Sequence, residues 1–293
     1  MKLIAKFNLI LFLIFAVALA GTGFVIHNLL QRNAKQEVLG NARIMIEAAL
    51  AVRAYTNTQI KPLLETQLKY TFLPQSVPAF SANQYFVNVR KKFPDYSYKE
   101  ATLNPTNPVN RAADWEADII RYFRQSPQQT ELIGERETPK GRVLYIARPM
   151  PIKDAKCLAC HNTPDTAPRT LVERYGDANG FGWKLNDIQT AQIVSAPTEL
   201  PIARANHVSR VFIASLAGVF LLIFLGVNAM LFFLVVRPVK RLSKTANEVS
   251  LGNMEAPEFH RNSKDEIGGL ADSFTRMRKS LAQAIKMLDG ESA

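Results

Sequence analysis

The chain has 293 residues, a formal net charge of +11 and a hydrophobic share of 47%. No basic motif with interleaved aromatic residues accompanies the positive charge, part of which follows an apolar segment, so we exclude a nucleic-acid-binding class and expect contact with membrane lipids. Two apolar segments leave about 180 residues between them, enough for one globular domain with its own core.

After a short N-terminus of residues 1–6, the first predicted element is a transmembrane helix over residues 7–27. Residues 7–26 contain no charged side chain and can cross about 30 Å of hydrocarbon. Cleavage as a signal peptide is the alternative, because Ala18-Leu19-Ala20 resembles a signal peptidase site. The apolar run continues to Ile26, beyond an ordinary signal sequence, which favours a retained span.

A stalk helix is predicted to follow and to reach the neighbourhood of Pro62. Its apolar stripe advances by alternating steps of three and four residues: Val38, Asn41, Met45, Ala48, Val52 and Tyr55. Such a stripe predicts a helix that leaves the bilayer directly and packs one face against the domain.

The remainder of the outer segment, which we assign to residues 31–209, predicts helices first and short strands later. Residues 79–92 and 114–124 have the spacing of helices, whereas residues 142–148 and 191–196 alternate as strands do, with another strand beginning at Tyr96. This order favours the α+β class with an antiparallel sheet.

The most informative motif is Cys157-Leu158-Ala159-Cys160-His161, which contains both cysteines of the chain. This spacing is typical of covalent c-type haem attachment. The two thiols add across the haem vinyl groups, and the adjacent His161 is predicted to be the proximal axial ligand of the iron. We therefore predict one covalently bound haem c.

Two other interpretations of the motif remain open. A structural zinc site needs four ligands, and the sequence has no second CxxC or HxxxH pair to complete one. A redox-active disulfide of the thioredoxin kind would follow a strand and open a helix in a βαβ unit, whereas this motif follows Pro149 and Pro151 and precedes Asn162-Thr163-Pro164.

The second axial ligand is left open by the sequence. Sulfur or imidazole donors on the outer side are Met45, Met150, His27 and His207. Both histidines flank the predicted spans, and Met150 is close to the haem peptide in the chain. Met45 is therefore the second-ligand candidate, with core packing as its alternative role and an open sixth position as the alternative for the iron.

A second transmembrane helix is predicted over residues 211–236, which contain no charged residue. Basic residues lie before the first span and after the second: Lys2, Lys6, Arg237, Lys240, Arg241 and Lys244. The positive-inside rule then puts both termini in the cytoplasm and the intervening domain in the periplasm, on the side where c-type haem is attached. The predicted location is a bacterial inner membrane.

Residues 237–289 predict two short heptad helices joined by a connector. Pro238 follows the second span, and one seam consists of Val239, Leu242, Ala246 and Val249. The second seam consists of Ile267, Leu270, Phe274, Met277, Leu281, Ala284 and Leu288. With Gly252 and Met254 in the connector and Asp265-Glu266-Ile267-Gly268 opening the second helix, this segment resembles a HAMP domain, an all-α coiled-coil bundle. The alternative is a generic amphipathic hairpin.

The outer segment resembles the Tll0287-like haem-domain family over roughly residues 35–205. The similarity is carried by Arg53-Ala54-Tyr55-Thr56-Asn57, Val77-Pro78-Ala79-Phe80, Tyr98-Lys99-Glu100-Ala101, Asn104-Pro105-Thr106-Asn107, the haem peptide and Gly180-Phe181-Gly182-Trp183. The resemblance implies a PAS-like sensory fold with one covalent haem attached through Cys157 and Cys160 and ligated by His161. The HAMP resemblance implies a homodimer through the HAMP and stalk helices.

Together these features predict a membrane-bound haem sensor that responds to redox state or a small gaseous ligand. Because the sequence has no kinase, cyclase or methyl-accepting motif, output is expected through a cytoplasmic partner of the kinase, cyclase or chemoreceptor-like kind, or from a longer form of the chain. The alternative function is a membrane-anchored monohaem cytochrome c for electron transfer. No Ser/His/Asp set, Walker loop or GxGxxG motif is present, so we do not expect an enzyme.

Overall fold

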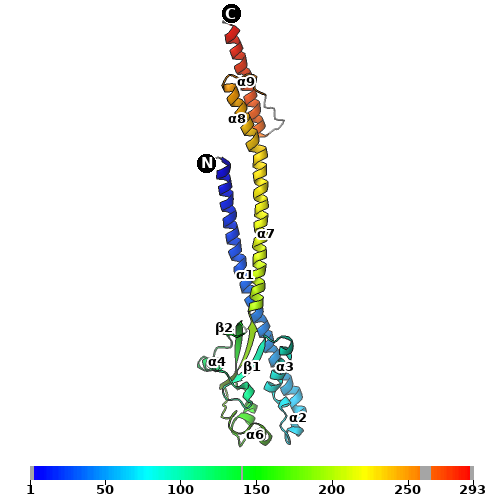
Figure 1. Cartoon of the computed structure of the whole chain (residues 1–293). Coiled ribbons are helices and arrows are strands. Elements are labelled where there is room, and N and C mark those ends of the chain that lie inside the picture. The colour runs from blue at the N-terminus through cyan, green and yellow to red at the C-terminus, as the bar shows by residue number, and fades with distance from the viewer. Residues whose placement is uncertain (1–2, 140, 258–264, 291–293) are drawn as a thin grey trace. The chain divides into compact units, whose positions relative to one another are not determined.

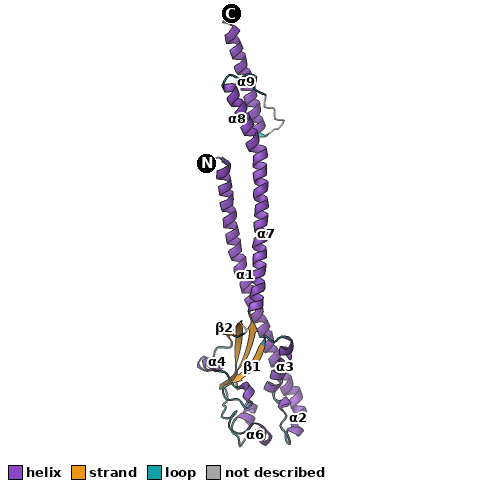
Figure 2. Cartoon of the chain, viewed as in Figure 1, coloured by secondary structure: helices purple, strands orange, loops and turns teal. Residues whose placement is uncertain are grey.

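The computed structural model describes residues 3–139, 141–257 and 265–290. The chain divides into two compact units, one of Gly23–Arg210 and one that combines Met1–Thr22 with Val211–Ala293. The first unit combines helices with a small antiparallel sheet, and the second is helical (Figure 2). The predicted α+β class of the outer segment is confirmed.

The sheet contains β1 (Ser97–Thr102), β2 (Leu132–Thr138), β3 (Gly141–Pro151) and β4 (Ile188–Pro197) in the order β1-β4-β3-β2. Every neighbouring pair of these strands is antiparallel. The strands beginning near Tyr96, at 142–148 and at 191–196 were predicted, but β2 was missed. It is an edge strand whose alternate side chains are exposed, so it lacks the apolar content of a buried strand.

Helices cover both faces of the sheet (Figure 1). On one face, α1 (Leu3–Tyr55) and α3 (Pro78–Lys92) pack around a cluster that includes Ile46, Phe86 and Ile146. On the other, α4 (Asp114–Gln125) packs its buried Ile120 and Phe123 against Ala101, Ala147 and Ala191. We call these the α1 face and the α4 face. Both predicted helices, at 79–92 and 114–124, are confirmed.

The buried stripe of α1 differs from the predicted one. Its fully buried members are Ala34, Val38, Ala42, Ile46 and Ala49. Asn41 is exposed and Tyr55 is 59% exposed, whereas Met45, Ala48 and Val52 lie at the cluster's edge. The prediction is therefore confirmed for Val38, which is buried, and in part for Met45, Ala48 and Val52, but it was wrong for Asn41 and Tyr55. The helix packs on a sheet mainly along four-residue steps, and small alanines permit close approach, so Ala42, Ile46 and Ala49 complete the buried face.

Each long helix passes through a π-helical segment just before a proline. Residues Thr56–Ile60 lie between α1 and α2 (Lys61–Leu68), whose second residue is Pro62. Residues Phe232–Val236 lie between α7 (Glu199–Leu231) and α8 (Arg237–Ser250), whose second residue is Pro238. Proline has no N–H and its ring clashes with the carbonyl four residues earlier, so a wider turn relieves the clash.

In the second unit, two helices are long and apolar enough to cross a membrane, in agreement with the two predicted spans. Their contact includes stacked rings of Phe15 and Phe220, whose centroids lie 4.7 Å apart. Neither apolar segment contains a charged residue, so their exposed apolar side chains suit a hydrocarbon environment.

The helices α8 and α9 (Glu266–Gly290) correspond to the predicted heptad pair. Leu242 and Val249 are buried, while Leu270, Met277 and Leu281 remain 43–59% exposed in the single chain. The described part of the connector includes Gly252 and Met254, and residues 258–264 lie outside the described residues, as does the side chain of Leu288. Half of the predicted seam therefore lacks a partner surface within one chain.

Candidate haem site

The haem peptide lies in a long excursion between β3 and β4, residues 153–185, which we call the haem loop. Backbone hydrogen bonds close its base: Ile152 N–H donates to Asp187 O over 3.1 Å, and Asn186 N–H donates to Ile152 O over 2.9 Å. The loop therefore leaves the sheet as one closed unit attached to the ends of two neighbouring strands, β3 and β4.

The two thiols lie on consecutive short helical turns, the 3-10 turn Ala155–Cys157 and α5 (Leu158–His161). Asp154 begins the first turn, where its carboxylate accepts a 2.8 Å hydrogen bond from Lys156 N–H. Cys157 is exposed and Cys160 is half-buried, and both thiols are free. An exposed thiol and a half-buried thiol on consecutive short turns, followed directly by an imidazole, fit covalent attachment of a porphyrin.

The orientation of His161 is set by its Nδ1 atom. Nδ1 lies 2.7 Å from the carbonyl oxygen of Gly180, and because a carbonyl oxygen can only accept, Nδ1 carries the proton and donates it. The lone pair is therefore on Nε2, which is the arrangement of a histidine that ligates a metal. Burial lowers the pKa of His161 against the opposing effect of the Gly180 hydrogen bond, so the imidazole stays neutral at physiological pH.

The indole of Trp183 fixes the plane of the imidazole. The His161 and Trp183 rings are stacked with centroids 3.9 Å apart and an interplanar angle of 6°. Trp183 is itself held by two hydrogen bonds, from its backbone N–H to His161 O at 3.1 Å and from Nε1 to Asn104 O at 3.3 Å. One face of the ring is thus covered, which leaves His161 little rotational freedom.

Asn104 joins the sheet side of the domain to the glycine-rich segment of the haem loop. Its Oδ1 accepts from Gly180 N–H and its Nδ2 donates to Phe181 O, both over 3.1 Å. Gly180 has φ +91, and a Cβ there would overlap Thr106. Only glycine combines that backbone conformation with so close an approach, and the resulting turn aims the Gly180 carbonyl at His161.

The surroundings of Cys160 weigh against a redox-active disulfide. Burial raises the pKa of the Cys160 thiol, with Lys61 at the start of α2 partly opposing the effect. Redox-active CxxC pairs have a lowered thiol pKa and open a helix after a parallel strand, whereas the strands described here are antiparallel. Among the described residues there is no group of three or more His, Cys, Asp or Glu that could hold a metal ion.

The candidates for the second axial position are spread over the domain. Met45 packs with the apolar cluster between α1 and the sheet. Since sixteen residues of helix separate it from Lys61, about 24 Å at 1.5 Å per residue, it lies far from the end of the helix whose charge acts on Cys160. Met150 pairs in register with Thr190 at the end of β3. His27 and His207 are exposed on α1 and α7. Ligation by Met45 stays a prediction, and its contacts are those of a core residue.

The sequence motifs contained the positioning residues without revealing their roles. Asn104, Gly180 and Trp183 belong to the segments that carry the family resemblance, but their convergence on His161 depends on contacts between residues 19 to 79 positions apart. Two signals in the sequence could have indicated these roles. One is Asn104, a polar residue directly before a proline, and the other is the glycine-rich turn at Gly180, which is close to the aromatic Trp183.

The site and fold define a haem-protein-like domain attached to helices that are long and apolar enough to span a membrane and to a pair of heptad helices, and comparison with known families agrees. The family model described as Tll0287-like matches residues 31–197, more than half of the chain, and the HAMP domain model matches residues 233–283. This chain belongs to the Tll0287-like family and carries a HAMP domain. No curated protein matches it.

Among solved structures, the chain is similar to the one titled as the crystal structure of the cyanobacterial heme-protein Tll0287. The sequence identity is 16%, and the alignment covers 55% of this chain and 95% of that chain with a TM-score of 0.43. The family membership therefore depends on the match of residues 31–197.

Proposed function

We propose that this chain is a membrane-bound sensor with one covalent haem c in a PAS-like periplasmic domain, and that it transmits haem state through its HAMP domain to a cytoplasmic partner. The observation that carries the proposal is the preset His161, with Nδ1 held by Gly180 O at 2.7 Å beside two free thiols, in one chain with a HAMP domain. We further propose that the chain has no catalytic activity of its own.

In this proposal Cys157 and Cys160 form the thioether bonds and His161 Nε2 is the proximal ligand. When bound, the haem supplies an iron that changes oxidation state or takes up a small gaseous ligand. Trp183 and Gly180 keep the imidazole in one plane and one tautomer, so a change in ligation acts on the haem loop instead of being absorbed by rotation of the ring.

A buried polar network supports a route from the sheet to α1. Arg53 on α1 donates to Glu100 over 2.5 Å, Glu100 accepts from Tyr98 Oη over 2.8 Å, and Gln192 donates to Tyr98 Oη over 2.9 Å. Burial, reinforced by Glu100, raises the pKa of Tyr98, so the phenol stays protonated and keeps donating. Since α1 also contains the first apolar span, a shift at β1 acts on a membrane-crossing helix.

The HAMP helices supply the output in this proposal. The exposed Leu270, Met277 and Leu281 are apolar side chains that a second copy would cover, which supports a homodimer through the HAMP and stalk helices. A difference of about 1–2 kcal/mol between two packings is the usual scale of allosteric coupling. The partner is proposed to be a kinase, cyclase or chemoreceptor-like protein.

A membrane-anchored cytochrome for electron transfer is the second candidate. The exposure of Cys157 favours it, because one thioether bond would then lie at the protein surface, where electrons exchange readily with a soluble donor or acceptor.

The two candidates differ in whether the haem state reaches the HAMP helices. In the full-length protein in membranes, cysteines introduced by Leu242→Cys or Leu281→Cys are expected to crosslink at different rates in the oxidised, dithionite-reduced and CO-treated states. Ser273→Cys, exposed on α9, is the control for reagent access. Identical crosslinking in all states, together with rapid oxidation by a soluble cytochrome, would contradict sensing and support electron transfer.

A further inference from the structure

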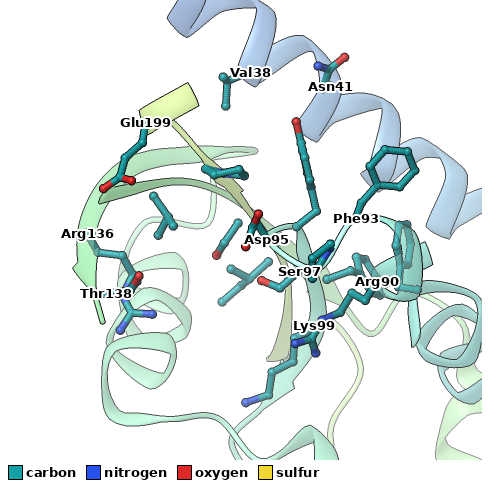
Figure 3. Close-up of a pocket in the computed structure, with 18 of the residues that line it drawn as sticks. Val38, Asn41, Arg90, Phe93, Asp95, Ser97, Lys99, Arg136, Thr138 and Glu199 are labelled. Atoms are coloured by element: carbon teal, nitrogen blue, oxygen red, sulfur yellow. The ribbon is translucent and has the colours of Figure 1, made fainter. Parts of the chain in front are cut away.

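The α4 face of the sheet is only partly covered by α4. The helix packs on the rows that contain Ala101, Ala147 and Ala191, whereas the rows toward the other end of the strands are outside this cluster. A cavity of about 920 Å³ opens over those rows. Its lining includes Ser97, Trp115, Arg136, Val143, Ser195 and Glu199, from all four strands of the sheet, α4 and the start of α7. Ser97, Arg136 and Glu199 are labelled in Figure 3.

Arg136 is the cation in this cavity that is oriented but not neutralised. Its guanidinium carbon lies 4.2 Å from the centre of the Trp115 ring, and Trp115 in turn contacts Tyr145 with ring centroids 5.5 Å apart. Among the described residues, Arg136 forms no ion pair and no side-chain hydrogen bond. The stacking therefore holds a planar, permanently charged group in place with its N–H donors unused.

The neighbouring lysine is in a different state. Lys99 Nζ donates to Glu116 Oε2 over 2.6 Å and to the carbonyl oxygen of Arg111 over 2.8 Å. Both side chains face the same cavity, but the charge of Lys99 is paired within the protein, whereas that of Arg136 is not paired with any described residue. Figure 3 shows Arg136, Ser97 and Lys99 among the side chains that line the cavity. Other charges occur in the lining: Glu37, Arg90, Lys92, Asp95, Glu199 and Arg204.

We propose that this cavity binds a small organic carboxylate, with Arg136 as the anchor of the carboxyl group. A guanidinium presents two parallel N–H donors that match the two oxygens of a carboxylate. Ser97 and Ser195 are partners in the β1–β4 register and offer hydroxyl groups, while Val143, Ile193 and Pro197 offer an apolar wall. The cavity volume lies within the usual range of about 300–1,000 Å³ for small-molecule sites.

This site is separate from the haem loop. The loop leaves β3 after Pro151, whereas the cavity lies over Val143, eight residues earlier in the same strand and about 26 Å away at 3.3 Å per residue. The cavity also reaches Glu199, the first residue of α7, which continues into the second apolar span. In this proposal, carboxylate binding is a second input, and its effect is transmitted through α7. The binding itself does not depend on the proposed role of the haem.

Calorimetric titration of the full-length holoprotein in detergent tests the site. Acetate, succinate and benzoate are titrated beside acetamide, succinamide and benzamide, which keep the shape and lose the charge. We expect saturable binding of at least one carboxylate and at least tenfold weaker binding of its amide. Arg136→Gln is expected to weaken the carboxylate at least tenfold, and Arg136→Lys to weaken it less.

Arg142→Gln is the matched control, since Arg142 is on the adjacent strand and pairs with Glu137 at the surface over 2.8 Å. Its affinity for the carboxylate should equal that of the unaltered protein. Absence of saturable binding for all three carboxylates, equal binding of acid and amide, or equal loss in the Arg136 and Arg142 variants would each overturn the proposal. The comparison of acid with amide requires no variant and stands even where a substitution impairs folding.

Discussion

The haem loop and the α8–α9 pair are held in place by two different kinds of contact. In the loop, His161 has one orientation because Gly180, Trp183 and Asn104 each contact it or its neighbours at a defined atom. In α8 and α9, a stripe of interchangeable apolar side chains sets the packing, and half of it is exposed in a single chain. The first region suits a chemically defined site, and the second suits a bundle with two similar packings.

The largest expected effect is the loss of covalent haem, which should follow from changes in the haem loop and not from changes in α9. Replacing both thiols, Cys157→Ser with Cys160→Ser, should abolish covalent haem, so that acidified acetone extracts all pigment and a haem-stained denaturing gel shows no band. Leu281→Ser on α9 should leave that band unchanged, as should Lys156→Ser beside the motif. Pigment retained by the double serine variant would refute thioether attachment.

A smaller effect is expected where the domain is joined to α1. Glu100 is almost completely buried and pairs with Arg53, whose side chain is 25% exposed. Arg53→Met leaves that carboxylate without its partner and should lower the free energy of unfolding by about 3 kcal/mol. Arg43→Met breaks an ion pair whose arginine is 47% exposed and should cost less than about 1 kcal/mol. Equal losses in denaturant unfolding would show that burial does not matter here.

At the haem loop, Asn104→Ala tests the contact that the segment after β1 makes with the loop. It removes the side chain that bonds both Gly180 and Phe181, and the loss should be about 2 kcal/mol, with a weaker His161 ligation seen in the visible spectrum. Asn88→Ala, on the exposed side of α3, removes two solvent-exposed bonds, one to Gln84 O and one from Lys91 Nζ, and should change neither quantity. An unaltered spectrum in the Asn104 variant would contradict its positioning role.

In the helical pair, Leu281→Ala should affect association instead of the fold of one chain. The side chain is 43% exposed in the single chain, so a loss of about 1–2 kcal/mol is expected only where a second copy buries it. Sedimentation in detergent should show weaker dimerisation, while Gln283→Ala on another side of α9 should leave it unchanged. Unchanged dimerisation of the Leu281→Ala variant would contradict the proposed homodimer interface.

The smallest effect is a pH dependence outside both regions. Hydrogen bonds from Arg43, and more weakly from Arg148, lower the pKa of Glu131 below its ordinary 4.5. Its contribution, about 0.5–1 kcal/mol, is therefore present above pH 4.5 and is lost as pH falls through the lowered native pKa. Glu131→Gln should lower the thermal midpoint at pH 7 and not at pH 3. Glu137→Gln, which is exposed, is the control.

The elements that could be predicted from the sequence are those whose residues repeat at a regular spacing. The spans, α3, α4 and the α8–α9 seams follow from spacing, because regular backbone repeats its own pattern. The orientation of His161 could not be predicted, because it depends on Asn104 and Gly180, which are distant in the chain and meet only after the sheet has formed. Asn41 and Tyr55 were wrongly placed on the buried face of α1 for a related reason, since packing against the sheet selects that face.

The two wide helical turns before Pro62 and Pro238 have a consequence for how the chain responds to its surroundings. The missing N–H is a covalent property, so neither lipid, ligand nor a second subunit can restore a regular hydrogen-bond ladder across these turns. The two imino acids, Pro62 and Pro238, therefore fix in the covalent chain where each long helix departs from α-helical hydrogen bonding.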